Sequence, residues 1–404
     1  MPSNQQNVLV CPLDWGLGHA SRMIPLIHQF LDKGYKVIIG GSGKSADLLK
    51  LTFPELHFIF VPSPQVQYPI KGSWLIVKLL SQVPTFALAA VREHRIIKKI
   101  IAEQNIHIVV SDNRYGLFCK KAYCILITHQ VSPVLPLILR WAEYPLYRII
   151  STIINRYNEC WIPDVPDPVD NLSGKLSHRF KLPGNARHIG ILSRFRHLTA
   201  DSEPAISEKY ELVIVLSGPE PQRYIWFNEL MTLSKKINRK TLIITGLHEE
   251  GPGQHISGHG PITIVSHLDC QRFCNVLVNA GSIICRSGYS SIMDLAALGK
   301  TALLVATPGQ TEQEYLAAYL TDKGYFTCVP QRNLSAELVL NYIGKEAGRS
   351  SRLFCESSQY VPIVTGLNEK YNQHGQKSHK ESGINLQCVV GSEPQPGESN
   401  KTGY

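Results

Sequence analysis

The chain has 404 residues, more than one hydrophobic core normally supports, so we expect two domains. Its 41 lysines and arginines exceed its 32 aspartates and glutamates, and the net charge of +9 indicates an anionic partner such as a nucleotide or an acidic membrane surface. The basic residues are scattered and form no aromatic-interleaved stripe, so we expect no nucleic-acid partner. The ten cysteines include no C-x-x-C pair and fit neither a zinc site nor a disulfide framework.

The first half of the chain alternates strand and helix patterns. We predict strands over residues 7–13, 35–41, 57–63, 107–112 and 124–129. Between the first two, residues 21–34 have the apolar periodicity of a helix that ends at Gly34. The strands are nearly continuous apolar runs, which is typical of a parallel sheet buried on both faces.

The turn after the second predicted strand reads GGSGKS and invites comparison with an ATP-binding loop. Gly43, Lys44 and Ser45 match the end of that motif, but its early glycine would fall at Ile38, inside the strand. We therefore interpret the glycines as a strand-to-helix turn at the sheet edge where open α/β domains bind ligands.

A second alternating series follows a stretch rich in proline, aspartate and glycine. We predict its strands over residues 210–218, 240–246, 262–268, 282–288 and 301–309. The expected fold class is α/β, with two doubly wound domains. The expected boundaries are residues 1–162 for the N-terminal domain, 163–205 for a linker, 206–348 for the C-terminal domain and 349–404 for a polar, disordered tail.

Two apolar stretches could concern a membrane. Residues 73–91 are interrupted by Lys78 and Pro84, and residues 131–150 contain three charged side chains, so neither is expected to span a bilayer. Either could lie on a bilayer surface, or both could be buried helices. The first apolar segment lacks a basic leader, so we expect no signal peptide and a cytoplasmic protein.

The first motif with chemical content is LDWGLGHASR, residues 13–22. Gly16 and Gly18 lie in the turn after the first predicted strand, and His19 stands at the amino end of the following helix. Glycines allow a ligand to approach the backbone, and an imidazole can accept a proton near neutral pH. The alternative is that the glycines only pack the turn and that His19 is a surface residue.

The second motif begins at the fourth strand of the C-terminal series. It reads CRSGYSSIMDLAALGK, and its turn offers Arg286, helix-end amides and the hydroxyls of Ser287, Tyr289 and Ser290, which suit a pyrophosphate. Asp294, in the same helix, could accept hydrogen bonds from ribose hydroxyls. Farther on, Glu312 and Gln313 follow a strand end, where polar side chains could bind a sugar.

The run CRSG…DLAALGK…P…EQ…A resembles the donor-binding signature of the family 28 glycosyltransferases, and LDWGLGHASR is similar to their amino-terminal glycine-rich turn. The resemblance covers roughly residues 8 to 345. It implies a GT-B fold, in which two Rossmann-like domains face each other across a cleft. It also implies a nucleotide-sugar donor as co-substrate, no other cofactor, and transfer without a bound metal.

By position, the resemblance implies further donor contacts. It would place Arg286, Ser287 and Gly288 near the nucleotide and Asp294 on the ribose. Glu312 and Gln313 match the pair that reads the transferred sugar. The resemblance also places Arg194 of GILSRF near the diphosphate, with Ser217 and Gly218 of LSGPEPQR as further phosphate contacts. Leu268 of SHL would contact the nucleotide base through its backbone.

The acceptor side departs from the family pattern. Where the cell-wall enzymes of the family have histidine, glutamate, glutamine and asparagine, this chain reads ITHQVSP and keeps only His129 and Gln130. We therefore doubt that the acceptor is the cell-wall precursor. Asp112, Asn113 and Arg114 follow another strand and suggest acceptor contacts, although Asp112 and Arg114 could instead form a structural ion pair.

These residues predict an inverting, metal-independent glycosyltransferase that moves a hexose, such as an N-acetylhexosamine, from a UDP-sugar to an acceptor hydroxyl. His19 is the candidate base, with Asp112 as the second choice. The acceptor would be a glycan or a lipid-linked molecule, which could bring the protein to the inner face of the membrane. The alternatives are a UDP-sugar 2-epimerase and a non-catalytic nucleotide-sugar-binding protein on the same fold.

Overall fold

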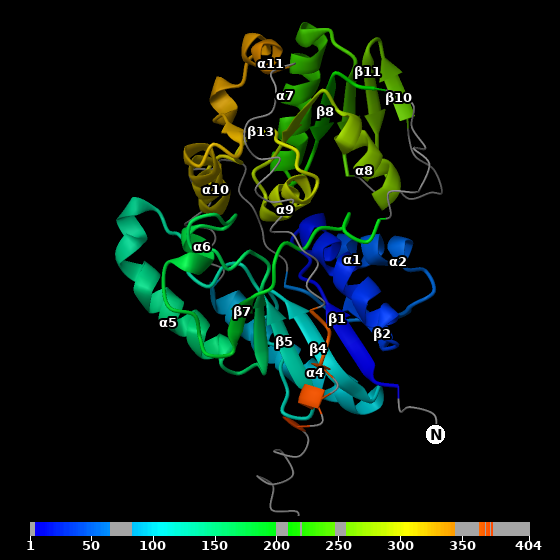
Figure 1. The fold of residues 1–404 in the computed structure, drawn as a ribbon, viewed down its shortest axis with the longest axis vertical. Coiled ribbons are helices and arrows are strands. Elements are labelled where there is room, and N and C mark those ends of the chain that lie inside the picture. The colour runs from blue at the N-terminus through cyan, green and yellow to red at the C-terminus, as the bar shows by residue number, and fades with distance from the viewer. Residues whose placement is uncertain are drawn as a thin grey trace, which may run out of the picture.

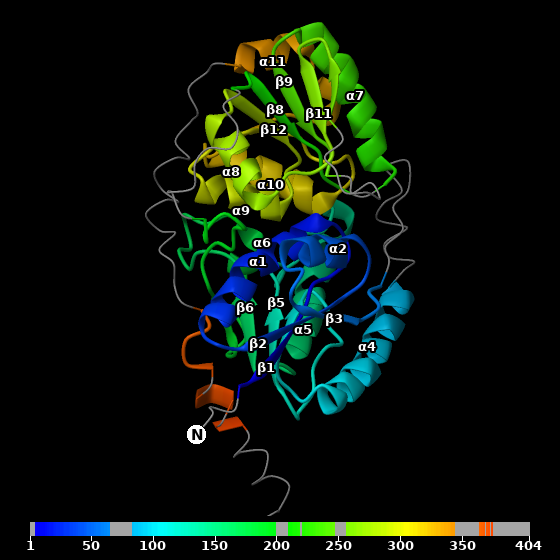
Figure 2. The same cartoon turned by 90° about the vertical axis from the view of Figure 1, so that its right-hand side faces the viewer.

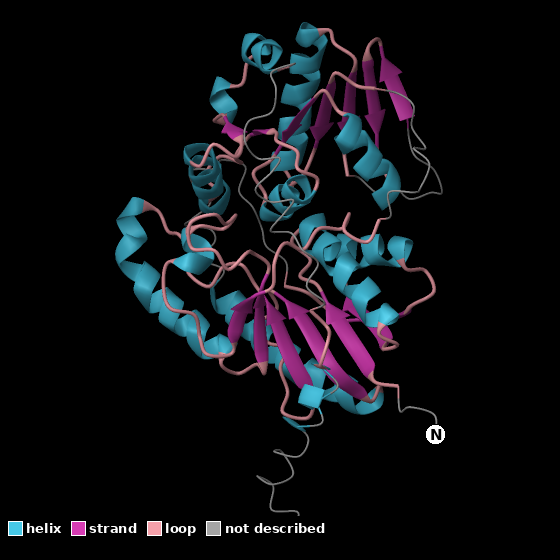
Figure 3. Cartoon of the chain, in the orientation of Figure 1, coloured by secondary structure: helices cyan, strands magenta, loops and turns pink. Residues whose placement is uncertain are grey.

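The computed structural model describes residues 5–64, 83–198, 209–218, 220–246, 256–343 and 363–374, the last range without residues 368 and 372. Two α/β domains lie one above the other, and each is built on its own sheet (Figures 1 and 3). The prediction of two doubly wound domains is therefore confirmed.

The N-terminal sheet has seven parallel strands in the order β3-β2-β1-β4-β5-β6-β7. Their bounds are Asn7–Cys11 (β1), Lys36–Gly41 (β2), His57–Phe60 (β3), Ile106–Asp112 (β4), Tyr123–Ile127 (β5), Glu159–Ile162 (β6) and Ala186–His188 (β7). The order reverses between β1 and β4, and such a switch point is where open α/β sheets bind ligands at the carboxyl ends of their strands.

Helices cover both faces of this sheet because successive strand residues point to opposite sides. Val8 and Val10 of β1 share a core with α1 (Leu17–Asp32) and α2 (Gly43–Thr52). Leu9 and Cys11 face the opposite core, with α4 (Val83–Glu103) and α5 (Glu143–Ile154), and α5 follows the 3-10 helix η2 (Leu137–Ala142). No helix among the described residues is both long and apolar enough to cross a bilayer.

The C-terminal sheet has the order β10-β11-β9-β8-β12-β13-β14, and its strands are parallel except for the edge strand β10. Their bounds are Leu212–Val215 (β8), Thr241–Ile244 (β9), Ile256–His259 (β10), Ile262–Val265 (β11), Ser282–Cys285 (β12), Leu303–Leu304 (β13) and Thr327–Cys328 (β14). The order reverses between β8 and β12, which is the switch point of this sheet. The predicted donor segments that begin LSGP and CRSG lie at the carboxyl ends of these two strands.

Five α-helices among the described residues cover this second sheet. They are α7 (Gln222–Ile237), α8 (Cys270–Asn279), α9 (Tyr289–Ala297), α10 (Thr311–Asp322) and α11 (Ala336–Tyr342), with the 3-10 helix η3 (Gln331–Asn333) before the last. Both α9 and α10 lie next to the lower domain (Figures 1 and 2), and their first turns contact it through Ser290 to Gly18 and through Glu312 to His129. These helix ends therefore approach the carboxyl edge of the N-terminal sheet.

Two segments differ from the expected organisation. Within the predicted linker, β7 pairs with β6 and extends the N-terminal sheet, although its three residues are too short and too polar to be recognised from their pattern. Within the predicted tail, Ile363, Val364 and Leu367 are buried, and Lys370 pairs with Glu159 of β6 at 2.5 Å. This short apolar run interrupts the polar composition and packs on the N-terminal domain; most of the remaining tail is outside the described residues.

Candidate active site

A cavity of about 610 Å³ lies between the domains, at the carboxyl ends of both sheets. One wall comes from the loops after β1, β4 and β5, and the other from the loops after β8 and β12 and from the start of α10. The two topological switch points therefore face each other across one cavity. Most of the predicted site residues line it: Gly16, Gly18, His19, Asn113, Arg114, His129, Gln130, Arg194, Ser217, Gly218, Leu268, Gly288, Tyr289, Ser290, Asp294, Glu312 and Gln313.

His19 is held by a buried carboxylate on the neighbouring strand. Its Nδ1 lies 2.9 Å from Oδ2 of Asp112, the last residue of β4. Arg22, one helical turn after His19, donates from Nε to the same oxygen at 2.9 Å and bonds the other oxygen through Nη2. Asp112 and Arg22 are almost wholly buried, whereas the His19 side chain keeps 18% of its surface exposed.

The contacts select one tautomer of His19. Asp112 is an acceptor when ionised, so the His19 Nδ1 facing it must have the proton, and Nε2 is then the basic nitrogen. The nearby Nη2 of Arg22, 2.8 Å from Nδ1, consequently cannot donate to that nitrogen and serves the carboxylate instead. The arrangement resembles the histidine–carboxylate part of a hydrolytic triad, in which the acid orients the base.

The electrostatics favour a neutral imidazole and a charged carboxylate. Burial lowers the pKa of His19, and the charge of Arg22 lowers it further, against the opposing effect of Asp112. Burial alone would raise the pKa of Asp112, but the charge of Arg22 and the hydrogen bonds from Arg22 and His19 hold it below its usual value. His19 is therefore available as a base near neutral pH.

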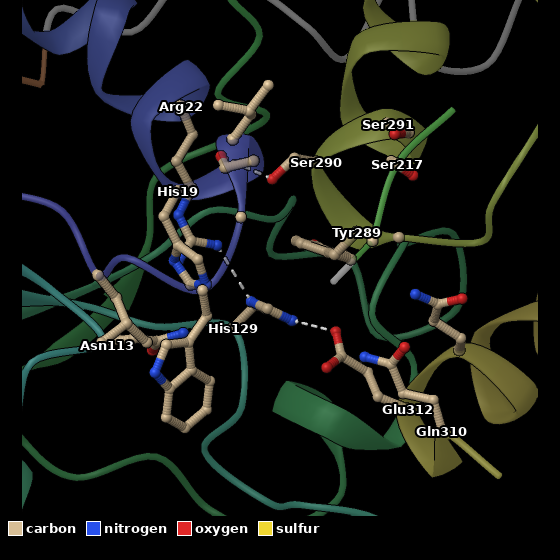
Figure 4. A pocket seen from close by; sticks show the side chains of 18 of the residues that line it. His19, Arg22, Asn113, His129, Ser217, Tyr289, Ser290, Ser291, Gln310 and Glu312 are labelled. Carbon is tan, nitrogen blue, oxygen red and sulfur yellow. Dashed lines mark hydrogen bonds and ion pairs between the residues drawn. The ribbon is translucent and has the colours of Figure 1, made fainter. Parts of the chain in front are cut away.

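The donor-side wall centres on the start of α9. Gly288 is the N-cap residue, and Tyr289, Ser290 and Ser291 form the first turn, whose amides are suited to an anion. Across the cavity, the Ser290 hydroxyl donates to the Gly18 carbonyl at 2.9 Å (Figure 4). A Cβ atom on Gly18 would lie 2.8 Å from the Ser290 oxygen, so this glycine lets the two domains approach closely.

Arg194 and Asp294, both predicted donor contacts, are bonded to each other. Arg194 Nε donates to Asp294 Oδ2 at 2.9 Å, and the Ser193 hydroxyl donates to Oδ1 at 2.8 Å. Both side chains line the cavity, so the pair offers a ligand in the cavity one cation and one hydrogen-bond acceptor. The interdomain segment that contains Arg194 is thereby attached to α9.

Three predicted donor residues, Arg286, Ser287 and Gln313, make their hydrogen bonds within the loops of the C-terminal domain. Arg286 lies over the ring of Trp226, with its guanidinium carbon 4.1 Å from the centroid, and donates to the carbonyls of Val305 and Ala306. Burial lowers the pKa of Arg286 to about 9. The Ser287 hydroxyl donates to the Gln313 carbonyl, and the Gln313 side chain accepts from the Thr307 amide. These groups support the loops around the cavity. Arg286 and Ser287 are not among the residues that line it, and their predicted contacts with the nucleotide stay predictions.

Arg114 lines the cavity, but its guanidinium is already paired, so its acceptor-side role stays a prediction. Arg114 is buried in an ion pair with Glu93, with Nε 2.8 Å from Oε1, and it donates to the carbonyls of Val61 and Pro62. Its partner is Glu93 of α4 because Arg22 already occupies Asp112. The neighbouring Asn113 has a left-handed backbone (φ +51°), and its buried Oδ1 makes no hydrogen bond within the described residues. That oxygen is available to a hydroxyl in the cavity.

The GGSGKS turn supports the histidine loop. The Asp14 carboxylate accepts from the Ser45 amide at 3.1 Å, and the Ser45 hydroxyl donates to the Leu13 carbonyl. A Cβ atom on Gly43 would collide with Asp14, which explains this glycine without a phosphate ligand. The interpretation as a strand-to-helix turn agrees with these contacts.

Arg22 is the main site residue that the sequence pattern missed. It stands three residues after His19, so a helix beginning at the glycine turn brings both onto one face. That spacing was the available signal. Among the described residues, no group of three or more histidine, cysteine, aspartate or glutamate side chains could hold a metal ion.

Comparison with known proteins agrees with this architecture. Residues 232–381 match the family model described as "Glycosyltransferase family 28 C-terminal domain". It is 35% identical over 335 residues to a UDP-N-acetylglucosamine–N-acetylmuramyl-(pentapeptide) pyrophosphoryl-undecaprenol N-acetylglucosamine transferase of Pasteurella multocida, which covers 81% of this chain and 85% of that protein. A shorter match to the enzyme of the same name from Haemophilus influenzae is 29% identical and covers 25% of this chain and 32% of that protein.

Solved structures give the same fold. The spinosyn forosaminyltransferase superposes with a TM-score of 0.59 at 12% identity, over 92% of this chain and 100% of that chain. The calicheamicin glycosyltransferase gives 0.58 at 13% identity, over 92% and 99%. The two domains and their shared cavity define a GT-B glycosyltransferase. The chain belongs to glycosyltransferase family 28, and the predicted fold, family and enzyme class are confirmed.

Proposed function

We propose that this enzyme transfers a hexose from a UDP-sugar to an acceptor hydroxyl in one displacement that inverts the anomeric centre. The observation that carries the proposal is the position of His19. Its Nε2 makes no hydrogen bond to a described residue, and its ring lines the cavity opposite the first turn of α9. A base and an anion-binding helix end therefore stand on opposite walls, as one displacement requires.

In this reaction His19 Nε2 removes the proton from the acceptor hydroxyl. The oxygen attacks the anomeric carbon, and the bond between that carbon and the diphosphate oxygen breaks, so UDP leaves with the bonding electrons. The α9 amides and Arg194 would stabilise the charge that develops on the diphosphate. Asp112 is buried and would orient His19 and stabilise the imidazolium, so the alternative of Asp112 as the base receives no support from its surroundings.

The acceptor would present an apolar portion next to its hydroxyl. The N-terminal wall near His19 includes Trp15, Phe86, Tyr115, Pro133, Val134 and Leu135. Among the described residues, three cationic side chains of the N-terminal domain line the cavity. Two of them are paired, Arg22 with Asp112 and Arg114 with Glu93, and the third is Lys44. A lipid-linked hydroxyl compound fits such a wall, and the Pasteurella relative is by name an undecaprenol-linked transferase.

Membrane contact is part of the same proposal. The described part of the 73–91 stretch belongs to α4, where Leu88 and Val91 are exposed together with Arg92, Arg95, Lys98 and Lys99. In η2, Leu137, Ile138 and Trp141 are also exposed. Exposed apolar side chains next to basic ones suit the surface of an anionic bilayer, which supports a peripheral position at the inner face of the membrane. Residues 73–82 lie outside the described residues.

A ligand screen with a coupled assay tests the proposal. UDP at about 100 times its dissociation constant should stabilise the fold by about 2.7 kcal/mol in a thermal shift measurement. With a lipid-like acceptor, UDP release should appear and should persist in EDTA. Sugar interconversion without an acceptor would indicate the epimerase instead, and binding without any turnover would indicate a sensor. Complete loss in EDTA with rescue by manganese would contradict the metal-independent mechanism.

A further inference from the structure

The carboxylate of Glu312 belongs to the C-terminal domain but is bonded by the N-terminal domain. Glu312 lies in the first turn of α10, and its Oε1 is 2.8 Å from Nε2 of His129. The Gln130 side-chain amide donates to the other oxygen, Oε2. Each oxygen of Glu312 is thus paired with a different residue of the loop that follows β5. Figure 4 shows the contact with His129.

The His129 ring is itself held on several sides. It stacks on the Tyr289 ring at 4.1 Å between centroids with an interplanar angle of 8°. Arg22 Nη1 lies 3.4 Å from His129 Nδ1. If Nδ1 accepts from the guanidinium, Nε2 has the proton and donates it to Glu312, so the neutral ring satisfies both neighbours. A single polar chain therefore runs from Glu312 through His129, Arg22 and Asp112 to the base His19.

Glu312 keeps capacity for a ligand. A carboxylate offers about four lone-pair positions, and the two contacts described here use one on each oxygen. Burial alone would raise its pKa, but the electrostatic interaction and the hydrogen bond with His129 hold the pKa of Glu312 below its usual value, so it remains an ionised acceptor. The remaining positions can accept from two hydroxyl groups of a sugar in the cavity, which Glu312 lines.

We infer that His129 and Gln130 are positioning residues that aim the Glu312 carboxylate at two hydroxyls of a neutral donor hexose. This inference rests on the proposed function. Sugar recognition then depends on both domains, because the C-terminal domain supplies the carboxylate and the N-terminal domain orients it. An anionic sugar such as a uronic acid should be disfavoured, since its own carboxylate would be repelled by Glu312.

Two substitutions of His129 separate its hydrogen bond from its ring contact. His129→Phe keeps a ring to stack on Tyr289 but has no donor for Glu312. His129→Gln places an amide nitrogen near the former Nε2 and loses the stack. If the hydrogen bond is what matters, His129→Phe should weaken UDP-hexose binding about 10-fold or more and His129→Gln should restore most of it. UDP alone lacks the sugar, so its affinity should stay within about twofold of the wild type in both variants.

The experiment is calorimetric titration of the whole enzyme with UDP, UDP-glucose, UDP-N-acetylglucosamine and UDP-glucuronate, followed by kinetics. His129→Phe should raise the KM for the neutral donors while changing kcat less. It should also reduce the ratio by which the enzyme binds neutral donors more tightly than UDP-glucuronate. Combined with Glu312→Gln, it should add little further loss, because both changes remove the same interaction.

Three outcomes would overturn the inference. Equal loss of UDP and UDP-hexose binding in His129→Phe would make the residue a support of the fold. Tighter UDP-hexose binding would mean that the contact competes with the donor and must break. Unchanged binding of every ligand would leave Glu312 independent of the N-terminal domain. A wild-type enzyme that binds none of the nucleotides would instead refute the proposed function, so the two failures are distinguishable.

Discussion

Nδ1 of His19 lies 2.9 Å from Oδ2 of Asp112, although 93 residues separate them in the chain. The contact arises because β1 and β4 are neighbours at the switch point of the N-terminal sheet, and both side chains follow the carboxyl ends of these strands. Arg22 neutralises the buried carboxylate, which would otherwise have to take up a proton in this apolar setting. The fold thereby holds an ionised Asp112 next to a neutral His19.

Replacing His19 tests the base assignment. His19→Ala should lower turnover by roughly 10²- to 10⁴-fold, because the acceptor hydroxyl loses the group that takes its proton. UDP affinity should change little, since the expected diphosphate contacts lie on α9 in the other domain. Turnover and UDP titrations measured on samples with matched melting curves provide the check. A parallel loss of binding and turnover would make His19 a donor contact.

The pH profile follows from the electrostatics of the pair. The base works only when neutral, so kcat/KM should fall as the pH drops through the pKa of His19. Because burial and Arg22 lower that pKa from 6.5, the acidic limb should lie below pH 6.5. Asp112→Asn removes the charge that opposes this shift and should move the limb to still lower pH while reducing turnover. An acidic limb above pH 6.5 in the wild type would contradict the assignment.

Local patterns predicted much of the fold, and particular residues show where they stopped. Apolar runs and glycine turns located β1, β2, β4, β5 and the start of α9, because a buried parallel sheet needs those residues. The same patterns could not tell that Arg286 turns away toward Trp226 or that Arg114 pairs with Glu93. These outcomes depend on which side chains meet across tertiary contacts, and several cations compete for few buried carboxylates.

The pair of Arg114 and Glu93 should be structural. Arg114→Met keeps much of the volume but leaves the Glu93 carboxylate buried without its partner, so unfolding free energy should fall by about 3–5 kcal/mol. The double variant with Glu93→Leu should recover part of the loss, because neither charge remains. Urea unfolding measures both. If Arg114→Met is stable but has a raised KM for the acceptor, Arg114 binds the acceptor and is not a structural residue.

Membrane binding should depend on the basic face of α4. Reversing Arg92, Arg95, Lys98 and Lys99 to glutamate should abolish salt-sensitive co-sedimentation with vesicles that contain anionic lipid. Reversing Lys235 and Lys236, which are exposed on α7 in the other domain, is a control with half the change of charge and should have little effect. Binding that ignores both salt and the α4 reversal would count against this surface.

The last prediction concerns Asp294, whose carboxylate accepts hydrogen bonds from two neighbouring residues. The oxygens of Asp294 accept from Arg194 and from the Ser193 hydroxyl. If a donor ribose also bonds this carboxylate, Asp294→Ala should remove most of the stabilisation by UDP, both through the lost ribose contact and because Arg194 loses its anchor. Asp294→Glu, which keeps the carboxylate, should restore it.

Uridine and inorganic pyrophosphate separate these two effects of Asp294→Ala. Loss of the ribose contact should weaken uridine, whereas release of Arg194 should leave pyrophosphate binding equal or stronger, because the freed cation can follow the anion. Thermal shifts with each ligand, at matched multiples of the wild-type dissociation constant, give the comparison. Uridine binding that survives Asp294→Ala while pyrophosphate binding fails would mean that Asp294 acts only by holding Arg194 against the diphosphate, and the ribose would then need another acceptor on the donor wall.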